Sequence, residues 1–376
     1  MEILGIDHVE MYVGDARQAA YYFSTAIGFE ECGHGGPETG LDGQRSLLLR
    51  HGEVRVLLTS GLGPGHPAAD YVHRHGDGIA VVALAVDDVV AAYTELVARG
   101  AAALTPPVSY AEGEAVVRTA LVGGFGDVVH RLVERRGDGA EFLPGAIRTS
   151  PAHAAREGAG DGAGAGKLFR RIDHLAVCVP SGQLAETVRR YEDVFGFHKI
   201  FAEYVEVAGQ GMNSEVVQSP SGQVTLVLIE PDPTRRPGQV SDFLRWHDGS
   251  GVQHLGLLTD DIVRSVTDLS ARGVGFGRTP VGYYERLEER VGPIGDPVER
   301  LRDLGILVDR DHGGQLLQIF TESMHVRRTL FLELIERRGA STFGSGNVRA
   351  LYEAKERELA ALAASGATPE RSGVPG

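Results

Sequence analysis

An unequal internal repeat constrains this chain more than any other feature of its sequence. The segment Ile6–Val9, which contains an Asp-His pair, returns as Ile172–Leu175. The run Gly78–Asp88 returns as Gly251–Asp261 at a constant offset. A register held over such a distance indicates duplication of one structural unit, so we expect two similar halves.

Three further pairs of segments extend the repeat toward the end of each half. The last of them aligns Arg131, just upstream, with Glu333. The two halves can therefore be compared residue by residue. The pairs are Ala98–Gly100 with Ala271–Gly273, Tyr110 with Tyr283, and Val133–Gly137 with Ile335–Gly339.

Only the second half has a set of side chains that can chelate a metal ion. A single histidine has many roles, but two imidazoles and one carboxylate with open positions opposite are the ligands of divalent iron in oxygenases. An arginine at the carboxylate position would repel a cation, so we expect one working site. The aligned triplets are His174, His254 and Glu333 in the second half, and His8, Val81 and Arg131 in the first.

Each candidate ligand lies in a run with the pattern of a β-strand. Because alternate residues of a strand share a face, we expect Phe331 beside Glu333, and Cys178 on the face of His174. We interpret Cys178 as a small core residue rather than a fourth ligand, since buried free cysteine commonly packs as a hydrophobe. The three runs are residues 172–179, 252–259 and 329–335.

Composition excludes several classes of partner. The chain has 376 residues, with 51 Asp and Glu against 37 Lys and Arg, an acidic excess that argues against nucleic acid or an anionic membrane. The first residues form no secretory signal, and no run reaches the ~18 apolar residues of a membrane helix. With only Cys32 and Cys178, no disulfide framework is credible, so we expect a cytoplasmic protein.

The organisation of the chain follows the repeat. Amphipathic helices are expected over Asp15–Ile27 and Gln183–Phe195, and two more open at Val86–Asp88 and Thr259–Asp261 and end in Arg-Gly. A Gly-Ala-Asp-rich stretch separates the halves and is typical of a linker. The expected division is a first domain without a metal site over residues 1–150, a linker over 151–168, a catalytic domain with a closing helix over 169–364, and a disordered tail over 365–376.

Paired strand-helix-strand modules whose second half supplies His, His and Glu resemble the vicinal oxygen chelate fold, and specifically the 4-hydroxyphenylpyruvate dioxygenase family. The resemblance covers nearly the whole chain. It implies an α+β fold of two tandem domains, each built of paired βαβββ modules that form an open barrel, with a C-terminal helix closing the second. Its most specific segments are Gly251–His254, Leu317–Thr321, Phe331–Ile335 and Phe343–Asn347.

The resemblance also implies the chemistry. Fe(II) would be held by His174, His254 and Glu333, with no catalytic residue beyond the metal centre. An aromatic 2-oxo acid would chelate the metal through its carboxylate and keto oxygens, and O2 would be the second substrate. The reaction implied by the family releases CO2 and oxygenates the nearest carbon, so the product depends on how the aromatic tail is held.

The expected tail pocket departs from the ring-hydroxylating members of that family. They usually carry Pro at the position of Val227, Asn at that of Ile229, and Phe at that of Val348. The changes remove a hydrogen-bonding amide and a large planar wall. They resemble the 4-hydroxymandelate synthase group, which hydroxylates the benzylic carbon of 4-hydroxyphenylpyruvate to give (S)-4-hydroxymandelate for 4-hydroxyphenylglycine in peptide antibiotics. The alternative is neutral drift in a dioxygenase that forms homogentisate in tyrosine catabolism.

Further pocket residues are assigned by the resemblance. Buried amides without partners are costly, so a cluster of them is expected to receive a polar guest. By simple alternation along the strand Gln253 would face away from His254, and a bulge or a twist of the strand is needed to bring both side chains inward. The remaining candidates for substrate binding are Ser214, Gln239, Gln318, Phe320, Phe331, Phe343, Asn347 and Leu351.

Two other functions fit paired modules of this fold. Extradiol catechol dioxygenases also use two His and one Glu, but they are usually shorter and lack the Gly-Asn approach to a closing helix. Ligand-trapping resistance proteins bind without metal, and an intact His-His-Glu set has no evident use in them. The fold is also compatible with a homodimer that pairs through its non-catalytic halves.

Overall fold

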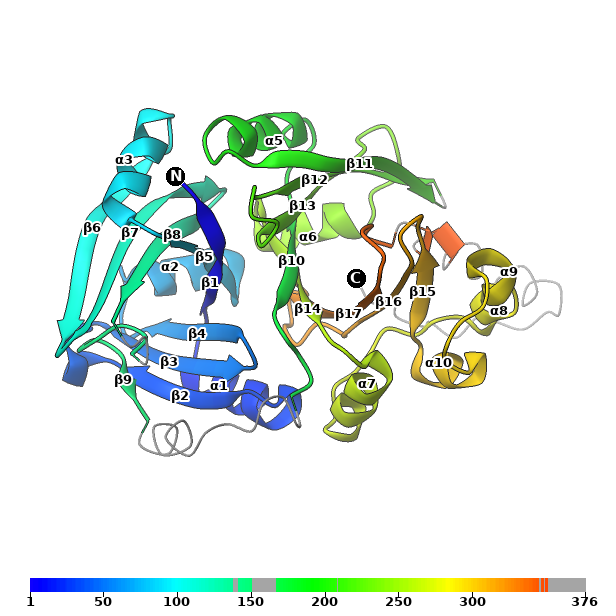
Figure 1. Ribbon diagram of the computed structural model, residues 1–376, viewed down its shortest axis with the longest axis horizontal. Coiled ribbons are helices and arrows are strands. Elements are labelled where there is room, and N and C mark those ends of the chain that lie inside the picture. Colours follow the sequence, from blue (N-terminus) through cyan, green and yellow to red (C-terminus); the bar gives the residue numbers. More distant parts are fainter. Residues whose placement is uncertain (138–140, 151–166, 208, 345, 348, 351–376) are drawn as a thin grey trace.

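The computed structural model describes residues 1–137, 141–150, 167–207, 209–344, 346–347 and 349–350. Two sheets with their helices lie side by side, the first half blue to cyan and the second green to orange (Figure 1). Val348, Leu351, the predicted tail and nearly all of the predicted linker lie outside the described residues.

In the described residues the first half forms a nine-stranded sheet of order β6-β7-β8-β5-β1-β4-β3-β2-β9. The strands are β1 (Ile3–Tyr12), β2 (Glu30–Gly35), β3 (Gln44–His51), β4 (Val54–Gly61), β5 (Gly78–Val86), β6 (Ala103–Glu112), β7 (Ala115–Phe125), β8 (Val128–Arg136) and β9 (Arg148–Thr149). The helices are α1 (Ala16–Tyr22) with its π-helical continuation η1 (Phe23–Ile27), the 3-10 turn η2 (Pro37–Thr39), α2 (Pro67–His75) and α3 (Val89–Ala98).

The described part of the second half forms an eight-stranded sheet of order β11-β12-β13-β10-β14-β17-β16-β15. The strands are β10 (Ile172–Cys178), β11 (His198–Val207), β12 (Gln210–Gln218), β13 (Thr225–Pro231), β14 (Gly251–Leu258), β15 (Leu307–Arg310), β16 (Gln315–Phe320) and β17 (Phe331–Arg338). The helices are α5 (Leu184–Asp193), α6 (Gln239–His247), α7 (Ile262–Ala271), α8 (Val281–Tyr284), α9 (Leu287–Val291) and α10 (Val298–Leu304).

Each half consists of two βαβββ modules, as the repeat predicts. In the first half β1 pairs antiparallel with β5, and each also pairs in parallel with the last strand of its own module, β4 or β8. The second half repeats this plan, with β10 against β14 and parallel partners β13 and β17. The expected α+β fold of tandem paired modules is confirmed.

The predicted helices form where their capping residues allow them to begin. Asp15 and Asp88 accept hydrogen bonds from backbone N–H groups in the first turn of α1 and α3, and Asp261 does so for α7. The chain leaves α3 and α7 through Gly100 and Gly273, both with positive φ. Local sequence therefore sets both ends of these helices.

The repeat breaks at one place, where the alignment of Tyr110 with Tyr283 is wrong as a structural equivalence. Tyr110 lies in the strand β6, whereas Tyr283 lies in α8. In the second half the helices α8, α9 and α10 stand between α7 and β15. Among the described residues the first half has no such helices between α3 and β6, so this segment is an insertion specific to the second half.

The main apolar core is continuous between the halves. Its cluster contains Leu132 of β8 together with Tyr191 of α5 and Leu269 of α7. Smaller clusters line the inner faces of the two sheets. None of the helices in the described ranges combines the length and apolar composition needed to cross a bilayer.

Candidate metal centre and substrate pocket

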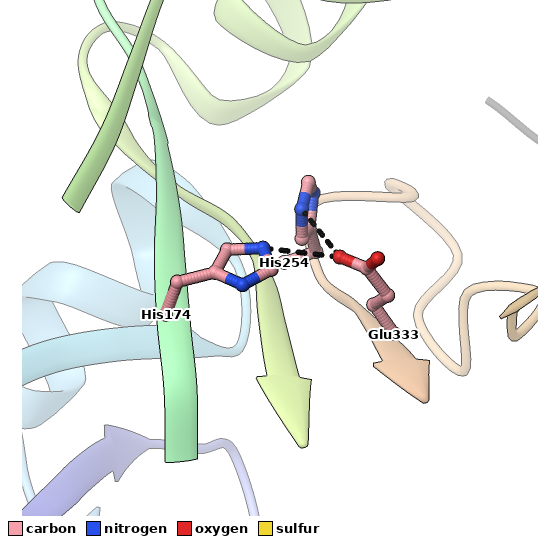
Figure 2. A group of neighbouring side chains, drawn as sticks. All are labelled: His174, His254 and Glu333. Atoms are coloured by element: carbon pink, nitrogen blue, oxygen red, sulfur yellow. Dashed lines mark ion pairs between the residues drawn. The ribbon is translucent and has the colours of Figure 1, made fainter. Parts of the chain in front are cut away.

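His174, His254 and Glu333 converge on one point from three adjacent strands. Glu333 Oε2 lies 3.0 Å from His174 Nε2 and 3.4 Å from His254 Nε2 (Figure 2). One ligand atom from each residue lies within 4.8 Å of the others. The three predicted ligands, which are far apart in sequence, therefore form a single cluster that could hold a metal ion.

Two β-bulges in the central strands shape this cluster. On β10 the ladder passes from Ile172 to His174 and skips Asp173, and on β14 it passes from His254 to Val252 and skips Gln253. A bulge places two residues of one strand opposite one residue of its partner and re-aims their side chains. The bulge that the sequence requires at Gln253 is therefore present, and a second one lies at Asp173.

Asp173 orients the imidazole of His174. Its Oδ1 lies 2.9 Å from His174 Nδ1, and Arg337 holds the same carboxylate through Nε at 2.8 Å and Nη2 at 2.7 Å. Arg337 also donates to the carbonyls of Ala340 and Thr342. A hydrogen bond of this kind fixes the ring and leaves Nε2 free as the ligand atom.

Burial and mutual attraction set the protonation of the cluster. Burial raises the pKa of Glu333, but the charge and hydrogen bonds of His174 and His254 lower it to about 2. Burial lowers the pKa of His174, but Glu333 and Asp173 raise it to about 9. Burial lowers the pKa of His254. The carboxylate is therefore ionised, and a metal ion that binds here would displace the proton of His174.

The side chains fit a divalent transition metal. Two imidazoles and a carboxylate are donors that such metals prefer. His254 Nδ1 is buried and has no hydrogen-bond partner among the described residues. One polar atom of the site is therefore still available for a hydrogen bond. Nothing in the donor set favours calcium or magnesium, which prefer all-oxygen ligands.

Aromatic rings enclose the metal-binding cluster. Phe331 stacks on His254 with centroids 5.0 Å apart, and Phe320 meets the same imidazole edge-on at 5.8 Å. Phe343 meets His174 edge-on at 5.5 Å. The predicted aromatic residues are thus brought together around the two imidazoles, where they can exclude water and pack against an aromatic substrate.

The wall beside the cluster is apolar. Cross-strand partners share a face of the sheet, and the register runs from His254 to Ala176, then to Val227, Val216 and Phe201. These four residues and Phe343 belong to one apolar cluster or pack on it.

A second row of partners runs beside the first. It passes from Cys178 to Ile229 and then to Ser214. Burial raises the pKa of the Cys178 thiol, which is therefore protonated and packs as a small apolar group, as its sequence context predicts. The predicted pocket residues Ser214, Val227 and Ile229 thus lie on the face of the sheet that carries the imidazoles.

The predicted amide side chains differ in how deeply they are buried. Gln318 and Asn347 are buried, and Gln318 Oε1 and Asn347 Nδ2 have no hydrogen-bond partner in the described part of the chain. Gln253 is buried at its bulge, and Gln239 is the half-buried first residue of α6. Contacts of Val348 and Leu351 stay predictions, since both lie outside the described residues.

In the first half an arginine occupies the equivalent place. Arg131 Nη1 lies 3.2 Å from His8 Nε2 and 2.7 Å from Glu10 Oε2. Glu10 accepts a hydrogen bond from Thr59 over 2.6 Å, and Thr59 contacts Ser46 over 2.8 Å. A network of polar and charged side chains therefore fills the first barrel where small and apolar residues line the second.

Sequence reasoning missed several residues of the site. The pair Asp173 and Arg337 could have been found, because both stand in repeated segments, opposite Asp7 and Arg135. Phe201 and Met212 pack on the pocket wall from β11 and β12. The register of β11 on β12, and of β12 on β13, leaves no mark in the local sequence, so no pattern could have identified them.

Comparisons with known proteins agree with this arrangement. The profile of the Glyoxalase/Bleomycin resistance protein/Dioxygenase superfamily matches residues 5–127 and 171–319, one match in each half. The 4-hydroxyphenylpyruvate dioxygenase of Yarrowia lipolytica is 34% identical over 95% of this chain and 92% of its own length. That of Caenorhabditis elegans is 31% identical over 94% and 92%.

Solved structures give the same result. A 4-hydroxymandelate synthase variant from Streptomyces coelicolor is 43% identical, with a TM-score of 0.84 over 96% of this chain and all of that one. A fusion protein of a xylose isomerase-like TIM barrel and a 4-hydroxyphenylpyruvate dioxygenase is 26% identical, with a TM-score of 0.70 over 96% of this chain and 52% of the fusion.

Proposed function

This chain belongs to the 4-hydroxyphenylpyruvate dioxygenase family of the Glyoxalase/Bleomycin resistance protein/Dioxygenase superfamily, and we propose that it is a 4-hydroxymandelate synthase. In this proposal it converts 4-hydroxyphenylpyruvate and O2 to (S)-4-hydroxymandelate and CO2. The product would supply 4-hydroxyphenylglycine for peptide antibiotics. The structural relative from Streptomyces coelicolor, which bears that enzyme's name, supports the assignment.

The apolar wall carries this proposal. Val227 and Ile229 lie in register with Ala176 and Cys178 on the face that carries the imidazoles. None of these four side chains forms strong hydrogen bonds, so the wall can hold an aromatic ring by packing but cannot anchor it through a ring-facing amide. A ring held by packing alone can settle with its benzylic carbon, rather than a ring carbon, nearest the metal.

Fe(II) is the metal that we propose for His174, His254 and Glu333. When bound there, it would supply the capacity to activate O2 and to chelate the 2-oxo acid. The chain's own residues position the reactants: Asp173 orients His174, and Phe320 and Phe331 shield His254 from water. The orientation in which the pocket holds the substrate then selects which carbon is oxygenated.

Homogentisate formation is the second candidate, and one observation favours it. The curated relatives at 31–34% identity are 4-hydroxyphenylpyruvate dioxygenases. This candidate uses the same ligands, substrate and fold. It differs only in the carbon that receives the oxygen, so the metal centre does not distinguish the two.

Product identification tests the proposal. The Fe(II)-loaded protein is incubated with 4-hydroxyphenylpyruvate and O2, and the product is separated by chromatography beside both standards, because hydroxymandelate and homogentisate have the same mass. Hydroxymandelate, resolved on a chiral column as the S form, is the expected result. Homogentisate as the main product would refute the proposal and establish the second candidate.

A further inference from the structure

Tyr283 connects the insertion of the second half to Asn347, one of the predicted pocket residues. It lies in α8, is almost fully buried, and stands beneath β15. Its hydroxyl oxygen lies 2.6 Å from Asn347 Oδ1, 2.6 Å from Arg290 Nη2 and 2.8 Å from the backbone nitrogen of Val308. Gly346 and Asn347 are both helical.

Counting hydrogen bonds fixes the direction of each contact. A phenolic hydroxyl donates one hydrogen bond and accepts up to two. Arg290 and the N–H of Val308 can only donate, so they use the two acceptor positions. The proton of Tyr283 is then given to Asn347 Oδ1 at 2.6 Å, in preference to the Val308 carbonyl at 3.0 Å.

This direction determines how Asn347 presents its amide. With Oδ1 bound to Tyr283, the Nδ2 donor is turned elsewhere, and Nδ2 is buried without a partner among the described residues. Leaving such a donor unpaired costs about 1–3 kcal/mol. The Asn347 amide therefore has one buried donor that is available to a group outside the described residues.

A second buried amide, that of Gln318, adjoins the same backbone turn as Asn347. The backbone N–H of Asn347 donates to the carbonyl of Gly344 over 3.0 Å. The Gln318 side chain approaches the Gly344 backbone closely, and Gly344 has φ +77°, a conformation that favours glycine. Gln318 Oε1 is likewise buried and unpaired. Both amides therefore adjoin the same backbone turn.

We propose that Tyr283 is a positioning residue that locks the Asn347 amide with its donor turned toward an oxygen of the bound aromatic 2-oxo acid. The inference rests on the proposed function for the identity of that acid. Tyr283 itself touches no substrate in this proposal. It acts by preventing the amide from turning over and by connecting Asn347 to β15.

The decisive variants are Tyr283→Phe and Tyr284→Phe. Tyr284 is the matched control, because it is equally buried in the same helix and its hydroxyl donates to the Ile306 carbonyl over 3.0 Å, without reaching Asn347. Each change removes one buried hydroxyl near β15, and Tyr283→Phe also removes the contacts with Arg290 and Asn347. A purely structural role of Tyr283 predicts a lower melting temperature with no change in substrate binding.

Anaerobic titration of each Fe(II)-loaded variant with 4-hydroxyphenylpyruvate measures binding without turnover. We expect Tyr283→Phe to weaken binding about tenfold, and to increase O2 consumed per hydroxylated product, while Fe(II) affinity stays at the wild-type value. Tyr284→Phe should retain wild-type binding and coupling. Equal effects of the two variants would overturn the proposal.

Asn347→Asp supplies a second measurement that does not depend on the folding of the tyrosine variant. The aspartate still accepts from Tyr283 but offers no N–H, so we expect at least the same tenfold loss of binding. Adding Tyr283→Phe to it should cost little more. Wild-type binding by Asn347→Asp, or full additivity, would contradict the proposal. Homogentisate from the wild-type protein would refute the proposed function alone, since the titration is read without any product.

Discussion

The carboxylate of Asp173 lies 2.9 Å from Nδ1 of His174, its neighbour in sequence. Adjacent residues of a regular strand point to opposite faces, and only the bulge in β10 brings this pair together. The first half has the same contact between Asp7 and His8, at 2.6 Å. There Arg131 occupies the position that corresponds to the metal site of the second half. The pair therefore belongs to the fold, and the second half uses it to orient a ligand.

Asp173→Asn is expected to weaken metal binding. The substitution keeps the shape of the side chain but removes the negative charge that holds His174 and Arg337. Loss of such an outer partner lowers metal affinity about 10- to 100-fold. Titration of the metal-free protein with Fe(II) under anaerobic conditions measures the change.

The first half provides the control for this change. Asp7→Asn removes the same charge from the same contacts with His8 and Arg135. It should lower the melting temperature to a similar extent and leave Fe(II) affinity unchanged. If both variants bind Fe(II) as tightly as the wild type, Asp173 has no role in the centre.

The double substitution Ile229→Asn with Val348→Phe should shift the product toward homogentisate. It restores an amide to the wall at the position in register with Cys178, and it places a large ring at position 348. The amide would give the substrate ring a polar anchor and move a ring carbon closer to the metal. Chromatography of the products measures the shift. An active double variant that forms only hydroxymandelate would show that these positions do not decide where oxygen is added.

A second metal centre should be recoverable in the first half. The register places Val81 beside Glu10 and Arg131 beside Ala83, just as His254 stands beside Ala176 and Glu333 beside Gly256. The triple change Glu10→Ala, Val81→His and Arg131→Glu copies the ligand set of the second half. We expect about two equivalents of bound metal per chain by elemental analysis, because His8 is already oriented by Asp7.

The control for the triple variant is its content of metal after His174→Ala is added. The second-half centre is then lost, and about one equivalent should remain. A folded triple variant that still binds a single equivalent would show that the first barrel cannot accommodate an ion.

Acid should loosen the contact between the two halves. His247 of α6 is buried against Tyr71 and His75 of α2, and Asp127 and Asp248 lie nearby. Burial, and next the charge of His75, lower the pKa of His247 to about 4.

The sign of the effect follows from this lowered pKa. Between pH 6.5 and pH 4 the His247 side chain is protonated in the unfolded chain but neutral in the folded chain. Stability is therefore present above pH 6.5 and lost as the pH falls toward 4, by up to about 3 kcal/mol for this group.

Denaturant titrations at several pH values check this expectation. His247→Gln should flatten the loss of unfolding free energy between pH 6.5 and pH 4, whereas His312→Gln, at an exposed position, should leave the wild-type slope. An unchanged slope for His247→Gln would exclude this histidine as the source.

Local sequence determined much of this protein. The repeat gave two halves, the Asp residues that cap α1, α3 and α7 gave their starting points, and period-two alternation gave the central strands. The contrast between Glu333 and Arg131 identified which half can hold a metal. These features are visible in sequence because capping, alternation and ligand chemistry act within a few residues or within a single side chain.

Only the tertiary structure decided how these parts meet. The register of the strands decided where the bulges at Asp173 and Gln253 lie and which residues continue the apolar row to Phe201. A contact between distant segments gives the hydrogen bond from Tyr283 to Asn347. The alignment of Tyr110 with Tyr283 failed for the same reason. Both positions carry a tyrosine, but Tyr110 lies in a strand and Tyr283 lies in a helix of the insertion. Alternation specifies which residues share a face of a strand, but it does not specify which residue of the neighbouring strand lies opposite them.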